Sequence, residues 1–283
     1  MAVLPVSIET VDHAAFTEAD LTALNIFENR REMEEWPGLP PIPKESTALD
    51  IHLTHPWRSS LRWLARRPSD VAVVGAARLE FQRVGGNRHL ASVDIYVLPE
   101  MRLRGVARAL LAPVVEAARR EGRQLLLFRS NSFVPAGEAF ARRLGARWGT
   151  TIDVNHLDLA TVDLDLMRRW LEPVWGFELR PWEGPFGTSQ VEAYLPVQRA
   201  MNTAPRDSLE VQDTVLTLEQ IRQNEFWLAQ RKTERWALFA HETGSGEVAG
   251  YTEVFWDAHR PEIIWQGDTV VIPKFRGRGL GRA

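Results

Sequence analysis

Two glycine-containing segments of the sequence have the residue types and spacing of a phosphate-binding loop. Arg102–Ala107 reads Arg-Leu-Arg-Gly-Val-Ala, and Arg276–Gly281 reads Arg-Gly-Arg-Gly-Leu-Gly. Small residues let neighbouring backbone N–H groups point at one place, and a helix that begins there adds unpaired donors and the positive end of its dipole. Both segments therefore predict a pyrophosphate site, and their arginines can pair with further phosphate oxygens.

Two common phosphate loops do not fit these segments. The dinucleotide loop needs Gly-x-Gly-x-x-Gly with an acidic residue about 20 positions later, whereas the glycines of 277–281 are spaced differently. The P-loop lysine and its neighbouring hydroxyl are also missing. The loops therefore belong to another class of phosphate-binding protein.

The two segments are parts of a longer internal repeat. Residues 94–109 align without gaps on residues 268–283, and half of the sixteen positions are identical. Each copy follows a predicted strand pair, at 71–81 and 89–97 in the first copy and at 236–242 and 248–256 in the second. A local match and an element order that agree independently indicate a tandem repeat.

With these residues the sequence resembles the GNAT acetyltransferase superfamily, whose pyrophosphate loop is (Gln/Arg)-x-x-Gly-x-(Gly/Ala) and often follows a Val-x-Pro. The resemblance implies an α/β fold of two tandem mixed, splayed β-sheets flanked by helices. It also implies that acetyl-CoA lies in the splay, with its pantetheine arm against the fourth strand. The implied cofactor-binding residues are Tyr96, Val97, Arg102, Leu103, Arg104, Gly105, Val106, Ala107 and Asn131 in the first copy, and Val271, Arg276, Gly277, Arg278, Gly279, Leu280 and Gly281 in the second.

The implied reaction is the direct attack of a small-molecule amine on the acetyl thioester. It needs a base for the proton of the ammonium group, and Asp268 and Glu253 are the catalytic candidates because they fall on predicted central strands. Ala141 stands where the family often has a tyrosine that protonates the leaving thiolate. This difference suggests a degenerate first half, and the sequence is similar in this respect to tandem family members such as the mycothiol synthases, which have one degenerate and one catalytic half. A non-catalytic acyl-CoA-binding or sensing protein is the alternative. A peptidyl or aminoacyl transferase is disfavoured by the two intact loops.

The expected domains are 1–160 and 177–283, joined by a linker with a bridging helix at 161–176. In the first domain we expect a strand at 3–9, helices at 13–35 and 56–66, and a helix at 106–120 that is kinked or broken at Pro113. A strand at 125–128, a helix at 135–144 and a strand at 147–159 should complete it. The resemblance also predicts that the natural protein continues beyond residue 283 with the remaining elements of the second copy.

Composition narrows the class of protein further. The formal charge is −3 over 283 residues, which gives no basic field for nucleic acid. There is no cysteine, so disulfides and a catalytic thiol are excluded and a cytoplasmic location is expected. We expect no metal and no membrane span; the His52 and His55 pair lacks the carboxylate pattern of a zinc helix. A homodimer is left open.

Overall fold

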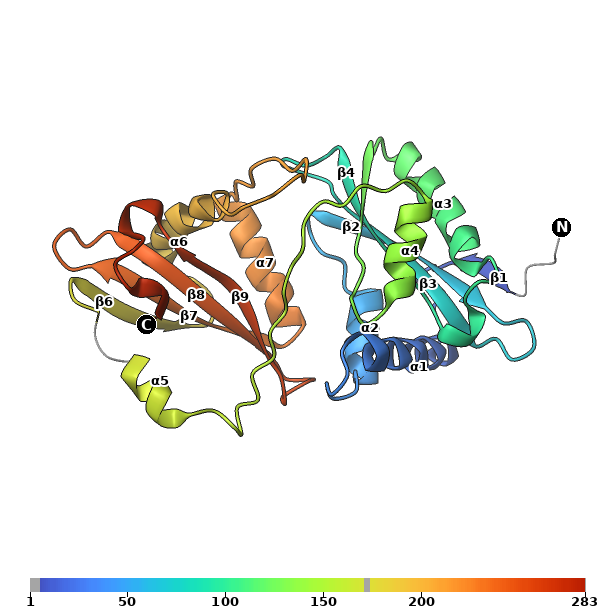
Figure 1. Cartoon of the computed structure of the whole chain (residues 1–283), viewed down its shortest axis with the longest axis horizontal. Coiled ribbons are helices and arrows are strands. Elements are labelled where there is room, and N and C mark those ends of the chain that lie inside the picture. Colours follow the sequence, from blue (N-terminus) through green and yellow to red (C-terminus); the bar gives the residue numbers. More distant parts are fainter. Residues whose placement is uncertain (1–5, 171–173, 283) are drawn as a thin grey trace. The chain divides into compact units, whose positions relative to one another are not determined.

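The computed structural model describes residues 6–170 and 174–282. The chain divides into two compact units, Met1–Arg147 (unit 1) and Trp148–Ala283 (unit 2), each built on its own sheet (Figure 1). No helix within the described residues is long and apolar enough to span a bilayer.

The described part of unit 1 holds a five-stranded mixed sheet. Its strands are β1 (Ser7–Thr10), β2 (Arg58–Arg66), β3 (Val73–Gln82), β4 (Leu90–Val97) and β5 (Leu125–Phe128), in that order across the sheet. The first four are antiparallel, and β5 lies parallel to β4. The pairing of β4 with β5 runs only from Leu90 to Val93. Among the described strands, none lies beside residues 94–97 of β4 on that edge, and the sheet splays open there.

Helices cover both faces of this sheet. The helices are α1 (Glu18–Glu35), α2 (Lys44–His52), α3 (Val106–Arg120) and α4 (Pro135–Arg143), and a short 3-10 turn, η1 (Pro99–Met101), joins β4 to the loop before α3. Gly75 of β3 faces α3, because a Cβ there would lie 3.2 Å from Leu110. Arg78 faces α1, since it shares Asp94 with Arg31. The odd and even positions of β3 thus serve opposite faces.

The described part of unit 2 holds a four-stranded sheet in which all neighbouring strands are antiparallel. Its strands are β6 (Phe177–Glu183), β7 (Thr233–Glu242), β8 (Val248–Asp257) and β9 (Ile264–Val271), in that order. The helices are α5 (Leu164–Trp170), α6 (Thr188–Met201) and α7 (Leu218–Gln230), followed after β9 by the 3-10 turns η2 (Pro273–Phe275) and η3 (Leu280–Arg282). Phe186, Val197 and Phe239 are central in its core.

Two predicted elements are wrong. The segment 56–66 forms strand β2 instead of a helix, because pairing with both β1 and β3 outweighs the helix-like spacing of Leu61 and Leu64. Residues 147–159 form no strand in the described structure, and several of their apolar side chains are exposed. The predicted helix at 106–120 is confirmed as α3, which continues through Pro113 without a break. The strand pairs predicted at 71–81 and 89–97 and at 236–242 and 248–256 are confirmed.

The predicted α/β class, with two sheets flanked by helices, is confirmed. The first sheet is mixed as predicted, whereas the described strands of the second sheet are all antiparallel. The predicted first strand lies partly outside the described residues, and its described end is β1.

Candidate functional site

The two predicted phosphate loops have the same backbone conformation. Leu103 and Gly105 have φ angles of 60° and 85°, and Gly277 and Gly279, at the matching positions, have 76° and 93°. Residues that alternate into the left-handed region turn successive N–H groups toward one side and form an anion-binding nest. Within the described chain, no main-chain carbonyl accepts a hydrogen bond from the amides of residues 103–108. These donors are therefore available to an anion.

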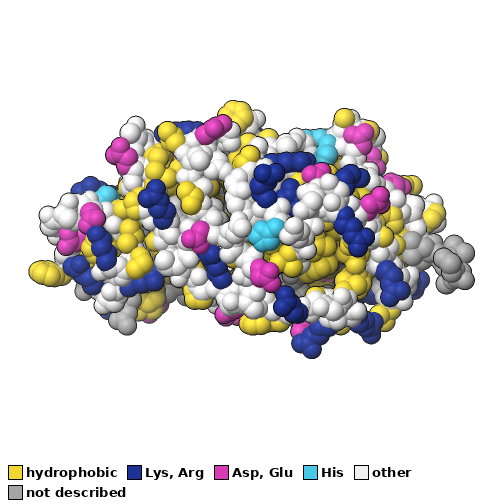
Figure 2. All heavy atoms as spheres, turned by 90° about the horizontal axis from the view of Figure 1, so that it is seen from above, with side chains coloured by type: hydrophobic (Ala, Val, Ile, Leu, Met, Phe, Trp, Pro, Cys, Tyr) yellow, Lys and Arg dark blue, Asp and Glu magenta, His cyan; other side chains and the backbone are white. Residues whose placement is uncertain are grey.

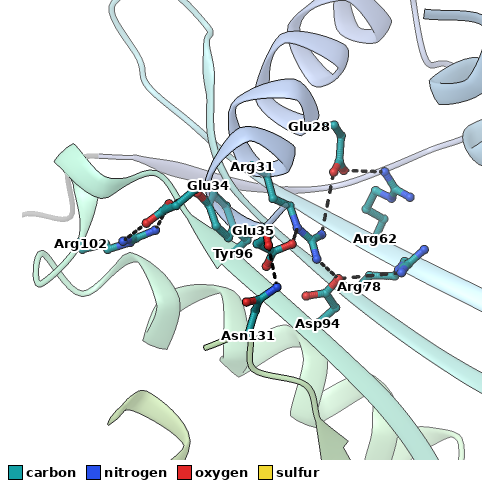
Figure 3. A network of polar contacts seen from close by, with 10 residues as sticks. All are labelled: Glu28, Arg31, Glu34, Glu35, Arg62, Arg78, Asp94, Tyr96, Arg102 and Asn131. Atoms are coloured by element: carbon teal, nitrogen blue, oxygen red, sulfur yellow. Dashed lines mark hydrogen bonds and ion pairs between the residues drawn. The ribbon is translucent and has the colours of Figure 1, made fainter. Parts of the chain in front are cut away.

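The first arginine of each loop holds the loop to the preceding strand. Arg102 Nε donates to the carbonyl of Val97 at 3.0 Å, and Arg276 Nε donates to that of Val271 at 3.0 Å. The remaining nitrogens of Arg102 bind Glu34 of α1 at 2.8 and 2.5 Å. This contact raises the pKa of Arg102 and lowers that of the Glu34 carboxyl. Arg102 therefore connects the loop at 102–107 to the end of β4 and to α1 (Figure 3).

The second arginine of each loop lies at the surface. Arg104 is exposed, and no acid pairs with it among the residues that the structure describes. Arg278 lies over the ring of Phe177 at 4.4 Å and is 4.0 Å from Glu242. Arg104 is thus the loop arginine that is free to meet a phosphate in unit 1, which the sequence alone did not distinguish from Arg102.

Two other residues predicted to bind cofactor in unit 1 already have partners. The Tyr96 hydroxyl donates to Glu34, and burial together with this contact raises the pKa of the tyrosine. Asn131, which follows β5, donates from Nδ2 to the carbonyl of Glu35 at 2.9 Å and accepts at Oδ1 from the amide of Phe133. Asn131 thereby ties the chain after β5 to the end of α1 (Figure 3).

The surface of unit 1 is hollowed where basic and apolar groups meet. In Figure 2, in the right half of the view where unit 1 is seen, Lys and Arg side chains border a hollow with hydrophobic side chains in its floor. Such a hollow suits a ligand that has both an apolar arm and charged groups.

The two predicted catalytic residues of unit 2 lie together. Glu253 projects from β8 and is 6% exposed, and its carboxylate accepts from the Tyr251 hydroxyl at 2.6 Å. The register of β8 and β9 shifts at Glu253, from Thr252 opposite Thr269 to Val254 opposite Gln266. This bulge places Glu253 beside Asp268, and the backbone amide of Asp268 hydrogen bonds to it.

Gly267 is required by this arrangement. A Cβ at Gly267 would lie 2.7 Å from Cγ of Glu253 and 2.7 Å from the Phe255 ring. A side chain at this position would therefore displace the Glu253 carboxylate, and glycine leaves the space in which it sits.

Burial sets the proton affinity of this pair of acids. It raises the pKa of the Glu253 carboxyl, against the opposing effects of Tyr251 and Arg235, and the charge of Asp268 raises it further. Burial also raises the pKa of Asp268. A carboxyl whose pKa is moved toward neutrality can exchange a proton with an amine, which is the property of a general base.

The tyrosines near these acids were missed in the sequence. Tyr251 lies two residues before Glu253, so the strand alternation puts both on one face of β8. Burial and the charges of Glu253 and Asp268 raise the pKa of Tyr194 on α6. The alternation could have identified Tyr251, whereas Tyr194 comes from a distant element and carried no local signal.

The residue of unit 1 that matches Asp268 has a different environment. Asp94 forms an ion pair with Arg31 of α1 at 2.7 Å and lies 3.8 Å from Arg78 of β3. Two positions that are alike in the repeat therefore differ in chemistry: Asp94 is neutralised by arginine, and Asp268 neighbours another acid.

Comparison with known proteins identifies the class to which this architecture belongs. Residues 29–146 match the model of the acetyltransferase (GNAT) family. A tandem GNAT protein from the clavulanic acid biosynthesis pathway, solved without acetyl-CoA, is 23% identical, with a TM-score of 0.71 over 98% of this chain and 82% of its own. A GCN5-related N-acetyltransferase from Sphaerobacter thermophilus is 17% identical, with a TM-score of 0.61 over 98% of this chain and 79% of its own.

A search of curated proteins gives no match. The family match is therefore confined to residues 29–146, and the chain as a whole has the fold of a tandem GNAT protein.

Proposed function

We propose that the chain is an acetyl-CoA-dependent N-acetyltransferase that transfers the acetyl group directly to a small-molecule amine. The observation that carries the proposal is the duplicated loop. In both copies the same two positions have positive φ angles, and the first arginine hydrogen bonds to a carbonyl at the end of the preceding strand. An anion-binding loop that follows a strand at the open edge of a sheet suits a ligand with a pyrophosphate and a peptide-like arm.

The residues present fit acetyl-CoA in unit 1. The amides of residues 103–108 would hold the pyrophosphate, assisted by Arg104 and by the amino-terminal end of α3. The unpaired edge of β4 at residues 94–97 would accept the amide groups of the pantetheine arm. In unit 2 the corresponding loop is 276–281, which contains Arg278. Acetyl-CoA supplies the acetyl thioester that the amine attacks.

In this proposal, transfer takes place in unit 2. Glu253 would take one proton of the incoming ammonium group. The amine nitrogen could then bond to the acetyl carbon as the carbon–sulfur bond breaks, and the second proton lost by the nitrogen would protonate the CoA thiolate. Tyr251 fixes the orientation of the Glu253 carboxylate by its 2.6 Å hydrogen bond. Asp268, beside it, keeps the proton affinity of the pair high.

A non-catalytic role for unit 1 has its own support. Arg31 and Arg78 neutralise Asp94, which leaves no free carboxylate at the position of Asp268. Ala141, on α4, has no proton to donate to a leaving thiolate. We therefore propose that unit 1 binds acyl-CoA without transferring the acyl group, and that unit 2 is the catalytic half.

The test is an assay of thiol release from acetyl-CoA in the presence of a panel of primary amines. The wild-type chain should release CoA with at least one amine. Glu253→Gln should lower kcat by about 100-fold or more, the usual contribution of a positioned base. Glu178→Gln, an exposed acid on the same sheet, is the matched control and should leave the rate unchanged. Full activity of Glu253→Gln would refute the assignment.

A further inference from the structure

Unit 1 contains a charged cavity that the proposed transfer reaction does not use. It has a volume of about 190 Å³ and lies between α1 and α2 on one side and strands β2, β3 and β4 on the other. At about 30 Å³ for each water, this is room for roughly six water molecules. Small alanine side chains of β3 form part of its wall, and charged side chains surround it (Figure 3).

One group of these charges is tightly paired. Arg31 contacts Asp94 at 2.7 Å and Glu35 at 2.8 Å. Burial by itself would lower the pKa of Arg31, but its carboxylate neighbours outweigh this effect and raise it. The charges of these three residues are paired with one another, so their side chains form a fixed part of the cavity wall.

A second group is paired only loosely. The Arg62 side chain is 8% exposed, and its contact with Glu28 is 3.4 Å long. Glu28 is the one acid within ion-pair distance of Arg62 in the described part of the chain, and the other contact of Glu28, with Arg31, is 3.9 Å. Arg78 lies 3.5 Å from Glu80 and 3.8 Å from Asp94.

Loose pairing is costly at this depth. A guanidinium has five N–H donors in a planar fork, and a desolvated charge with few close partners is unfavourable. Arg62 and Glu28 thus present a weakly paired cation and a weakly paired anion to the same cavity, on β2 and α1 respectively.

We propose that this cavity binds a small zwitterion of the α-amino-acid type, with its carboxylate on Arg62 and Arg78 and its ammonium group on Glu28. The guanidinium fork matches a planar carboxylate. The cavity is lined by three arginines and five acids, a formal balance of −2, so a phosphate or another lone anion is disfavoured. A zwitterion adds no net charge and satisfies both loosely paired side chains.

This site is separate from the proposed transfer reaction. Its lining residues lie between positions 28 and 94 of unit 1, whereas the proposed base lies in unit 2. Binding to it can be measured without acetyl-CoA, so this proposal and the proposed function can fail independently.

The experiment is isothermal titration calorimetry of the full chain with glycine, L-alanine and L-serine, each alone and without acetyl-CoA. At least one of them should bind saturably. Propionate, which is L-alanine without the ammonium group, and ethylamine, which lacks the carboxylate, should each bind at least about tenfold more weakly than L-alanine, because each loses a charged hydrogen bond.

Variants locate the site. Arg62→Met and Glu28→Gln should each weaken amino-acid binding by about tenfold or more. Arg67→Met, an exposed arginine outside the cavity, is the matched control and should bind like wild type. If Arg62→Met fails to fold, the titrations of Glu28→Gln and those with propionate and ethylamine still test the proposal. The proposal is overturned if none of the three amino acids binds, if propionate or ethylamine binds as well as L-alanine, or if Glu28→Gln binds unchanged.

Discussion

Replacing Glu253 by glutamine should stabilise the protein at high pH while it removes the proposed base. The carboxyl is 6% exposed and its pKa is raised in the folded state, so the folded protein binds its proton more tightly than the unfolded chain does. In that case stability is full below the unfolded value of 4.5 and falls as the pH rises through the folded pKa. Glutamine keeps the acceptor oxygen for Tyr251 and carries no charge.

The size of this effect follows from the linkage relation. Each unit by which the pKa is raised costs about 1.4 kcal/mol of stability once the pH exceeds both values. Because the pKa of this carboxyl is raised, we expect Glu253→Gln to raise the free energy of unfolding at pH 8, by an amount within the ~0.5–2 kcal/mol that single stabilising substitutions commonly give. At pH 4 the difference should vanish.

The assay is urea unfolding of wild type and variant at pH 4, 6 and 8. The free energy of unfolding is taken from the urea transition whose midpoint the substitution changes. Asp268 remains in the variant and its raised pKa acts in the same direction, so the variant should keep part of the pH dependence. Glu178→Gln controls for the loss of one surface charge. The reasoning is refuted if Glu253→Gln is less stable than wild type at pH 8, or if the difference between them does not depend on pH.

Three further predictions each concern a single side chain. Tyr251→Phe removes a hydrogen bond that lowers the pKa of Glu253, so the acidic limb of the pH–rate profile should move to higher pH; an unchanged profile would contradict the contact. Arg31→Met leaves Asp94 without its closest partner and should cost about 2 to 3 kcal/mol in chemical denaturation, less than for a fully buried pair because Arg31 is 23% exposed. Leu103 is 96% exposed at a φ of 60°, so Leu103→Gly should change stability by less than about 1 kcal/mol, and a larger loss would show that the side chain packs.

The loops could be predicted from the sequence because their chemistry is local. The glycines in 102–107 and 276–281 indicate where the backbone takes positive φ angles, and the repeat places the same motif at two points in the chain. The role of Arg102 could not be predicted in the same way. Its partner Glu34 lies 68 positions earlier and meets it only after α1 packs beside β4.

The same limit applies to the acids. Asp94 and Asp268 are identical in the repeat, and only the neighbours brought by other elements make one an arginine-paired side chain and the other a member of an acidic pair. Strand β2 was misread for a related reason, since short apolar runs have ambiguous periodicity and the sheet decides the outcome.

The central claim is that the loop at 102–107 is a cofactor site, and the most direct measurement is a calorimetric titration of acetyl-CoA into the full chain and into Gly105→Glu. Gly105 has a φ of 85°, so glutamate there is strained and also places a negative charge in the nest. The account predicts saturable binding by the wild type, a loss of the binding at this loop in Gly105→Glu, and no such loss in Glu178→Gln. Absence of binding by the wild type, or identical titrations of wild type and Gly105→Glu, would contradict it.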